Sequence, residues 1–188
     1  MRPLLLVLLV TACSKPGGPS NPALRGELLA MMDQDQAARA TLVPDASGML
    51  VGPEHTVEDV DARTTARMKQ IIAQVGWPTR RLVGDDGAHA AWLLVQHADA
   101  DLAFQKACLA AMEHQLATRE VSPVDYAYLF DRVALHDGRK QRYGTQFADG
   151  REPFPIEDPA NVDARRAEVG LPTLAEGIQQ MHQKYGLQ

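Results

Sequence analysis

The chain has 188 residues, of which 45% are hydrophobic and 23% charged, and it carries a net charge of -5 at neutral pH. This length and composition are typical of one globular domain with a short extra segment. The mildly acidic charge, with Lys and Arg scattered along the chain, excludes the basic surface that a nucleic-acid-binding protein needs.

The extra segment lies at the N-terminus and has the three parts of a secretory signal. Arg2 supplies a short positive region, residues 4–10 form an unbroken apolar run, and Thr11 and Ala12 are small. The apolar run is far too short to span a bilayer. The sequence therefore predicts a signal peptide over residues 1–12.

The four residues from Val10 to Cys13, VTAC, resemble the lipobox of bacterial lipoproteins. The resemblance implies cleavage before Cys13, addition of diacylglycerol and palmitate to that residue, and anchoring to a membrane of the cell envelope. Ser14 follows in place of an acidic residue, which implies the periplasmic face of the outer membrane in a Gram-negative cell. A plain secretory signal with an incidental Cys13 is the alternative. Residues 13–21 then form a flexible linker rich in Pro, Gly and Ser.

Residues 22–188 are predicted to form a single helical domain, because capping residues followed by apolar residues at helical spacing recur along them. The third helix is expected to take Asp85 or Asp86 as its cap, and the fourth Asp99 or Asp101. The predicted helices cover residues 22–39, 56–75, 86–98, 102–116, 123–137, 159–169 and 174–185.

The pattern changes between the fifth and sixth predicted helices. Residues 141–147 contain Tyr, Thr and Phe, and Asp149 with Gly150 is a strong signal for a tight turn. We expect at most a short β-hairpin near residues 141–156. Six to seven helices with so little strand predict a mostly α, orthogonal bundle and argue against a sandwich or a doubly wound sheet.

The most informative polar residues lie at the end of the third predicted helix, which is otherwise apolar nearly all round and therefore expected to be buried. Gln96 and His97 are followed by Asp99 and Asp101. One interpretation makes His97 a general base or metal ligand, with Asp99 or Asp101 orienting the ring or joining the metal. The other makes His97 a core histidine bonded to a carbonyl, and it is favoured because no HExxH or CxxC motif is present.

A second polar group lies on the first predicted helix. Asp35 and Gln36 are followed by Arg39, and Asp35 and Arg39 have the spacing of a helical ion pair. Most such runs are solvated faces, so a role in a ligand pocket is the less favoured interpretation here.

A third polar group contains Tyr143 and Gln146, with Gly144 between them allowing a close approach of the backbone. Its side chains are candidates for lining a pocket, and a turn packed on the bundle is the alternative. Asp131 and Arg132 form a further polar pair.

Absent motifs narrow the function. The chain has no GxSxG elbow, phosphate-binding loop or GxGxxG sequence, which argues against a serine hydrolase or a nucleotide-driven enzyme. Lipidation of Cys13 leaves Cys108 without a disulfide partner, and the spacing of Cys108 from Phe104 and Met112 predicts a buried core residue.

Several short motifs occur in an order that resembles a bacterial domain family of unknown function. The resemblance covers about residues 24–180 and implies one intact domain, with no established reaction. It also suggests that the segments QHAD and YGTQ meet at one site, near Asp35, Gln36 and Arg39. The motifs are GWP at 76–78, QHAD at 96–99, YGTQ at 143–146, PIEDP at 155–159 and RRAEVGL at 165–171.

The favoured function is a membrane-anchored envelope lipoprotein. We expect it to bind a small molecule or an envelope protein through a polar pocket around Gln96, His97 and Gln146. A purely structural envelope protein is a further possibility, and no cofactor is indicated.

The alternative function is a metal-assisted hydrolase. In it, His97 and Asp99 act as base or metal ligands, and Arg39 or Arg142 holds an anionic substrate group. Tyr143 or Gln146 then stabilises the developing charge.

Overall fold

The computed structural model describes residues 18–44, 50–52, 56–148 and 151–186, so the predicted signal peptide and Cys13 lie outside the described residues. The described part contains seven α-helices and two short antiparallel strand pairs, which confirms the predicted mostly α bundle. The helices are α1 (Pro22–Arg39), α2 (Thr56–Val75), α3 (Arg80–Gln96), α4 (Leu102–Leu116), α5 (Pro123–His136), α6 (Val162–Glu168) and α7 (Leu174–Tyr185).

The predicted hairpin is present as β3 (Phe147–Ala148) paired with β4 (Glu152–Pro153). A second pair, β1 (Val43–Pro44) with β2 (Leu50–Val51), lies between α1 and α2 and was not predicted. A 3-10 turn (Pro159–Asn161) precedes α6.

Local capping explains most helix starts. The side chains of Asn21, Asp101 and Ser122 accept hydrogen bonds from backbone N–H groups three residues later, at 3.0, 3.0 and 3.2 Å. Thr173 and Glu176 form the reciprocal capping box of α7. Asp101 therefore caps α4, and the alternative cap Asp99 is wrong.

The predicted start of α3 is also wrong, because the helix begins at Arg80, six residues before the predicted start at residue 86. Thr79 caps this helix, and its Oγ1 accepts from the backbone N–H of Leu82 at 3.4 Å. Gly84 then adopts φ +77°, which breaks the helical dihedrals and separates this first turn from the rest of α3. Asp85 and Asp86 follow the break, so they lie inside the helix.

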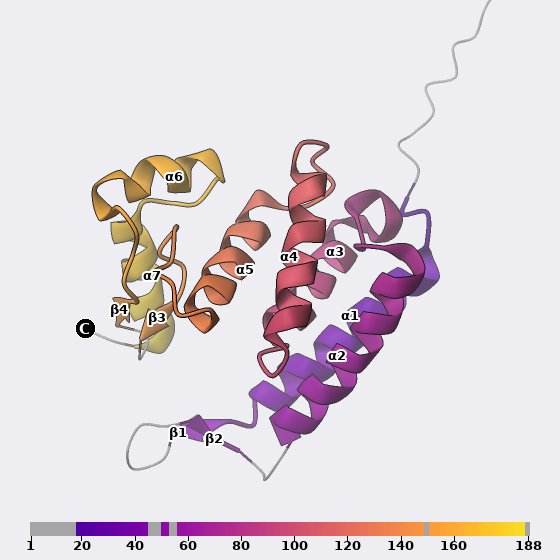
Figure 1. The fold of residues 1–188 in the computed structure, drawn as a ribbon. Helices are drawn as coiled ribbons and strands as arrows, with labels where there is room; N and C mark the ends of the chain where they lie inside the picture. The colour runs from indigo at the N-terminus through magenta and orange to yellow at the C-terminus, as the bar shows by residue number, and fades with distance from the viewer. Residues whose placement is uncertain (1–17, 45–49, 53–55, 149–150, 187–188) are drawn as a thin grey trace, which may run out of the picture.

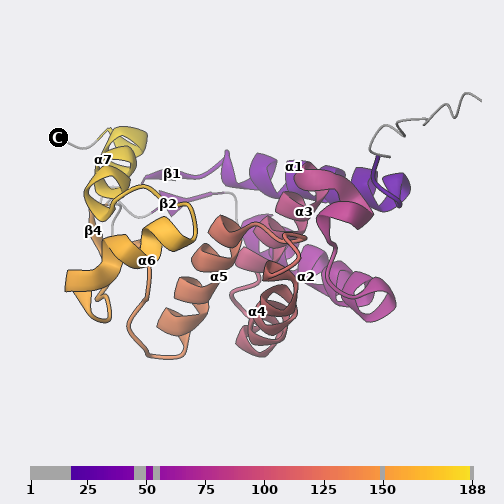
Figure 2. The ribbon, with the colours of Figure 1, turned by 90° about the horizontal axis from the view of Figure 1, so that it is seen from above.

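The five helices α1 to α5 pack side by side, with α6, α7 and the β3–β4 pair grouped at the C-terminal end beyond α5 (Figures 1 and 2). The main core is formed by the apolar faces of the helices α1 to α5, and Cys108 is buried in it, as predicted. Burial raises the pKa of this thiol to about 12. A smaller apolar cluster, around Ala127, Tyr143 and Leu171, joins α5 to the C-terminal group. None of the helices in the described residues is both long and apolar enough to cross a membrane.

Candidate functional site

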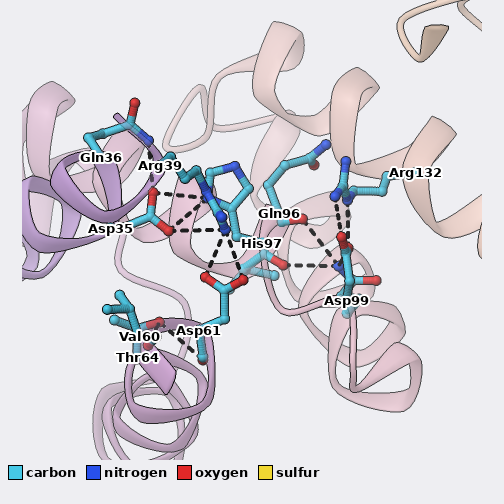
Figure 3. Close-up of polar contacts among 12 residues, drawn as sticks. Asp35, Gln36, Arg39, Val60, Asp61, Thr64, Gln96, His97, Asp99 and Arg132 are labelled. Atoms are coloured by element: carbon cyan, nitrogen blue, oxygen red, sulfur yellow. Dashed lines mark hydrogen bonds and ion pairs between the residues drawn. The ribbon is translucent and has the colours of Figure 1, made fainter. Parts of the chain in front are cut away.

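His97 ends α3 and points its ring toward α1. Its Nδ1 lies 2.9 and 3.0 Å from the two carboxylate oxygens of Asp35 and 3.0 Å from Nε of Arg39 (Figure 3). The partners of Nδ1 are thus a carboxylate and a guanidinium, in place of the main-chain carbonyl that a simple core histidine would use. The segment QHAD and the polar group of the first helix therefore meet in space.

Asp35 is the most deeply buried member of this network, with no exposed side-chain surface. It accepts a hydrogen bond from Nε2 of Gln36 at 2.7 Å and lies 3.3 Å from Nη2 of Arg39. Burial acts to raise the pKa of Asp35, but the bonds to His97 and Gln36 and the charge of Arg39 outweigh it, and the net shift is downward. Asp35 is therefore an anion at neutral pH.

The single Nδ1 atom of His97 cannot satisfy both of its neighbours at once. Arg39 can only donate, and ionised Asp35 can only accept. A proton on Nδ1 makes the bond to Asp35, whereas a lone pair makes the bond to Arg39. The Asp35 anion favours the proton on Nδ1, and in the neutral ring this leaves the lone pair on Nε2.

The Nε2 atom of His97 makes no hydrogen bond to any described residue, and 17% of the side chain is exposed. His97 is one of the residues that line a groove of about 470 Å³ between α2 and the segment that joins α3 to α4. The groove is lined by Glu58, Asp61, Ala62, Thr65 and residues 97–101.

Asp61 on α2 completes the network, and it was not predicted from the sequence. Nη2 of Arg39 donates to its two carboxylate oxygens at 2.7 and 2.9 Å, so Arg39 connects α1 with both α2 and α3. Burial raises the pKa of Asp61 and outweighs the bond to Arg39. In the sequence Asp61 resembles any other polar residue on the outer face of an amphipathic helix, and no local signal distinguishes it.

A second arginine connects the segments QHAD and YGTQ. Arg132 on α5 donates from Nε to Asp99 at 2.7 Å, and its Nη2 binds the other carboxylate oxygen. Nη1 of Arg132 lies 3.3 Å from the side-chain oxygen of Gln146. Burial acts to raise the pKa of Asp99, but Arg132 outweighs it and the pKa is held low. Gln96 is buried between His97 and Arg132, and its Oε1 has no hydrogen-bond partner among the described residues (Figure 3).

A model described as a family of unknown function (DUF6624) matches residues 22–188 of the chain. The protein belongs to this family. The predicted resemblance to a domain family of unknown function is thereby confirmed. Neither a curated protein nor a solved structure matches the chain.

In this DUF6624 domain the side chain of Tyr143 does not reach the groove. Its ring packs edge-on against Phe130, with the ring centroids 5.9 Å apart, in the smaller apolar cluster. The turn around it is held by buried Asp131, which accepts from the backbone N–H groups of Arg142, Tyr143 and Thr145. Burial raises the pKa of Asp131 despite these bonds. The turn packed on the bundle is therefore the arrangement observed around Tyr143.

The remaining predicted residue, Arg142, lies apart from the other arginines. Its guanidinium lies 5.8 Å from the ring centroids of Phe130 and Tyr143, and its nearest carboxylate is Glu157 at 3.9 Å. It does not join the group around Arg39.

Arg39 occupies the point of the DUF6624 domain where Asp35, Asp61 and Nδ1 of His97 converge, so the protein itself supplies the positive charge there. Across the described part of the chain, no group of three or more His, Cys, Asp and Glu side chains is arranged to hold a metal ion. His97 and Asp99, the pair of metal ligands suggested by the sequence, bond to different groups, His97 to Asp35 and Asp99 to Arg132.

Proposed function

We propose that the protein is an envelope lipoprotein, anchored through lipid on Cys13, that binds a small organic cation in the groove beside His97. The observation that carries the proposal is that His97 lines a groove of about 470 Å³, with its Nδ1 bonded to buried Asp35 and with an Nε2 atom that bonds to no described residue. Its lone pair is an acceptor for an ammonium N–H group.

The lining of the groove supports a cationic ligand. It contains four carboxylates and no Lys or Arg. Three of the four carboxylates also pair with a cation that is not part of the lining, namely Arg39, Lys69 or Arg132. The methyl groups of the alanines between the acidic residues offer apolar contact to an aliphatic chain. A primary alkylamine satisfies both properties. The four carboxylates are those of Glu58, Asp61, Asp99 and Asp101.

Thermal unfolding and calorimetry of the full-length protein with 1-butylamine test this proposal. At a concentration of roughly a hundred times the dissociation constant, a specific ligand adds about 2.7 kcal/mol and raises the unfolding midpoint by a few degrees. His97→Phe removes both ring nitrogens, and with them the acceptor, and is expected to abolish the shift, whereas His114→Phe changes an exposed histidine of α4 and keeps it. A wild-type protein that does not respond to 1-butylamine contradicts the proposal.

Membrane anchoring rests on the sequence of residues 1–13, and fractionation of expressing cells tests it. The wild-type chain is expected in the membrane fraction and Cys13→Ala in the soluble fraction. Cys108→Ala keeps Cys13 and serves as the control. A Cys13→Ala variant that still sediments with membranes refutes the lipid anchor.

A hydrolase is the second candidate, because a carboxylate bonded to Nδ1 and an open Nε2 are the arrangement of a general base. Here Asp35 orients the ring, in the role predicted for Asp99 or Asp101 from the sequence. Hydrolysis of p-nitrophenyl acetate is expected to fall about 100-fold or more in His97→Gln if His97 is the base. A chelator added to the wild type separates a metal-assisted reaction from one that uses His97 alone. Equal rates in wild type and His97→Gln exclude this candidate.

A further inference from the structure

Arg166 on α6 is buried among carbonyl groups. Only 3% of the residue is exposed. Its Nε donates to the carbonyl of Pro172 at 2.6 Å, and its Nη1 donates to the carbonyls of Tyr143 and Gly144 at 2.6 and 3.3 Å. These bonds attach α6 to the turn that follows α5.

The charge of Arg166 has no counterion in contact with it. No carboxylate of the described residues lies within ion-pair distance of its guanidinium, and Asp163 and Asp131 act on it only through space. Burial lowers the pKa of the guanidinium accordingly. A buried charge without a partner is costly, and carbonyl groups compensate it only in part.

The Nη2 atom of Arg166 retains its hydrogen-bonding capacity. It makes no hydrogen bond to any described residue. It lies beside Gly177 of α7, where an added Cβ would approach it to 2.7 Å. The absence of a side chain at Gly177 is therefore what leaves room around this atom.

A cavity of about 240 Å³ opens at this point between α5, the segment 144–147 and α7. Its lining includes the guanidinium of Arg166 and, among the described residues, contains no Asp or Glu, in contrast to the groove beside His97. Apolar side chains cover another part of the wall, among them Phe147, Leu171 and Met181.

We propose that this cavity is a second binding site, which takes a small organic carboxylate with its carboxyl group on Nη2 of Arg166 and its apolar body against Leu171 and Met181. A carboxylate supplies both the acceptor that Nη2 lacks and the missing counterion. The apolar wall favours an organic acid over a bare inorganic oxyanion, which has no surface to place there. The site is independent of the groove beside His97.

Calorimetric titration of the full-length protein with butyrate tests the site, with the isosteric neutral amide butyramide and inorganic phosphate as comparisons. Butyrate is expected to bind and butyramide to show no binding, because the amide brings no charge to Arg166. Phosphate that binds as tightly as butyrate overturns the assignment of an organic acid. A wild-type protein that fails to bind butyrate overturns the site itself.

Gly177→Ala places a methyl group against Nη2 and keeps the arginine, and it is expected to weaken butyrate binding at least tenfold. Gly26→Ala makes the same change in α1, where nothing lies within 4 Å of the added atom, and is expected to leave binding unchanged. Met181→Trp fills the apolar end without touching Arg166 and is expected to weaken binding as well. Wild-type affinity for butyrate in both Gly177→Ala and Met181→Trp refutes this location. Neither variant is expected to alter the response to 1-butylamine, which binds in the other groove.

Discussion

Two partly or fully buried arginines of this domain have opposite surroundings. Arg39 lies between the carboxylates of Asp35 and Asp61, whereas Arg166 is bonded only to carbonyl groups. The hollows beside them are opposite as well, since one is lined by acidic side chains without a Lys or Arg and the other by basic side chains without an Asp or Glu. A buried cation whose charge is neutralised by carboxylates of the same protein gains little from an anionic ligand. A buried cation that is bonded only to carbonyl groups still gains from one.

The largest effect is expected from removing the compensated cation. Arg39→Met removes the cation between Asp35 and Asp61, so that Asp61 loses its ion pair and Asp35 keeps only its bonds to His97 and Gln36. We expect a loss of about 3 kcal/mol in the free energy of unfolding. Without Arg39 the pKa values of both carboxylates in the folded state are higher than in wild type, so the stability of this variant relative to wild type recovers as the pH falls and they take up protons. Urea unfolding at a series of pH values measures both effects.

Arg139→Met is the control for this experiment, because Arg139 pairs with Asp137 on the surface with half of its side chain exposed. It is expected to leave the free energy of unfolding nearly unchanged. A loss in Arg39→Met no larger than in Arg139→Met would show that the network around Arg39 adds nothing to stability.

A smaller effect, without acid recovery, is expected at the uncompensated arginine. Arg166→Met removes the donors to three carbonyl groups but strands no carboxylate, so we expect a loss of about 2 kcal/mol. The difference in free energy of unfolding from wild type is expected to be the same at pH 5 and pH 7. Stability of Arg166→Met that recovers in acid as it does in Arg39→Met would mean that a carboxylate compensates Arg166 after all.

The smallest effect concerns the pH dependence of Asp35. Because the folded protein lowers the pKa of this carboxylate, its contribution to stability is fully present above its unfolded pKa and is lost as the pH falls through the folded pKa. Asp35→Asn removes that contribution, and we expect a loss of about 1 kcal/mol at pH 7 that narrows in acid. Chemical denaturation of both proteins between pH 7 and pH 3 measures the gap, and a gap that widens in acid contradicts the direction of the shift.

The sequence was sufficient wherever the deciding interaction is local. The caps at Asn21, Ser122 and Thr173 bond to groups three residues away, and the ion pair of Asp35 with Arg39 spans a single helical turn. Such contacts follow from the geometry of one helix, and helical periodicity identifies the core face for the same reason. The start of α3 escaped prediction because Gly84 adopts a conformation that a helical pattern does not reveal.

By contrast, only the tertiary structure decided which groups meet. His97 finds its partners 62 and 58 residues away, on a helix whose polar face looks solvated in the sequence. Asp61 and Arg166 lie in ordinary charged stretches of their helices, and their burial depends on what the rest of the chain places over them. The pattern of a sequence indicates which face of a helix is apolar, but not which distant element packs against that face. The charges that line both proposed sites depend on which distant elements come together.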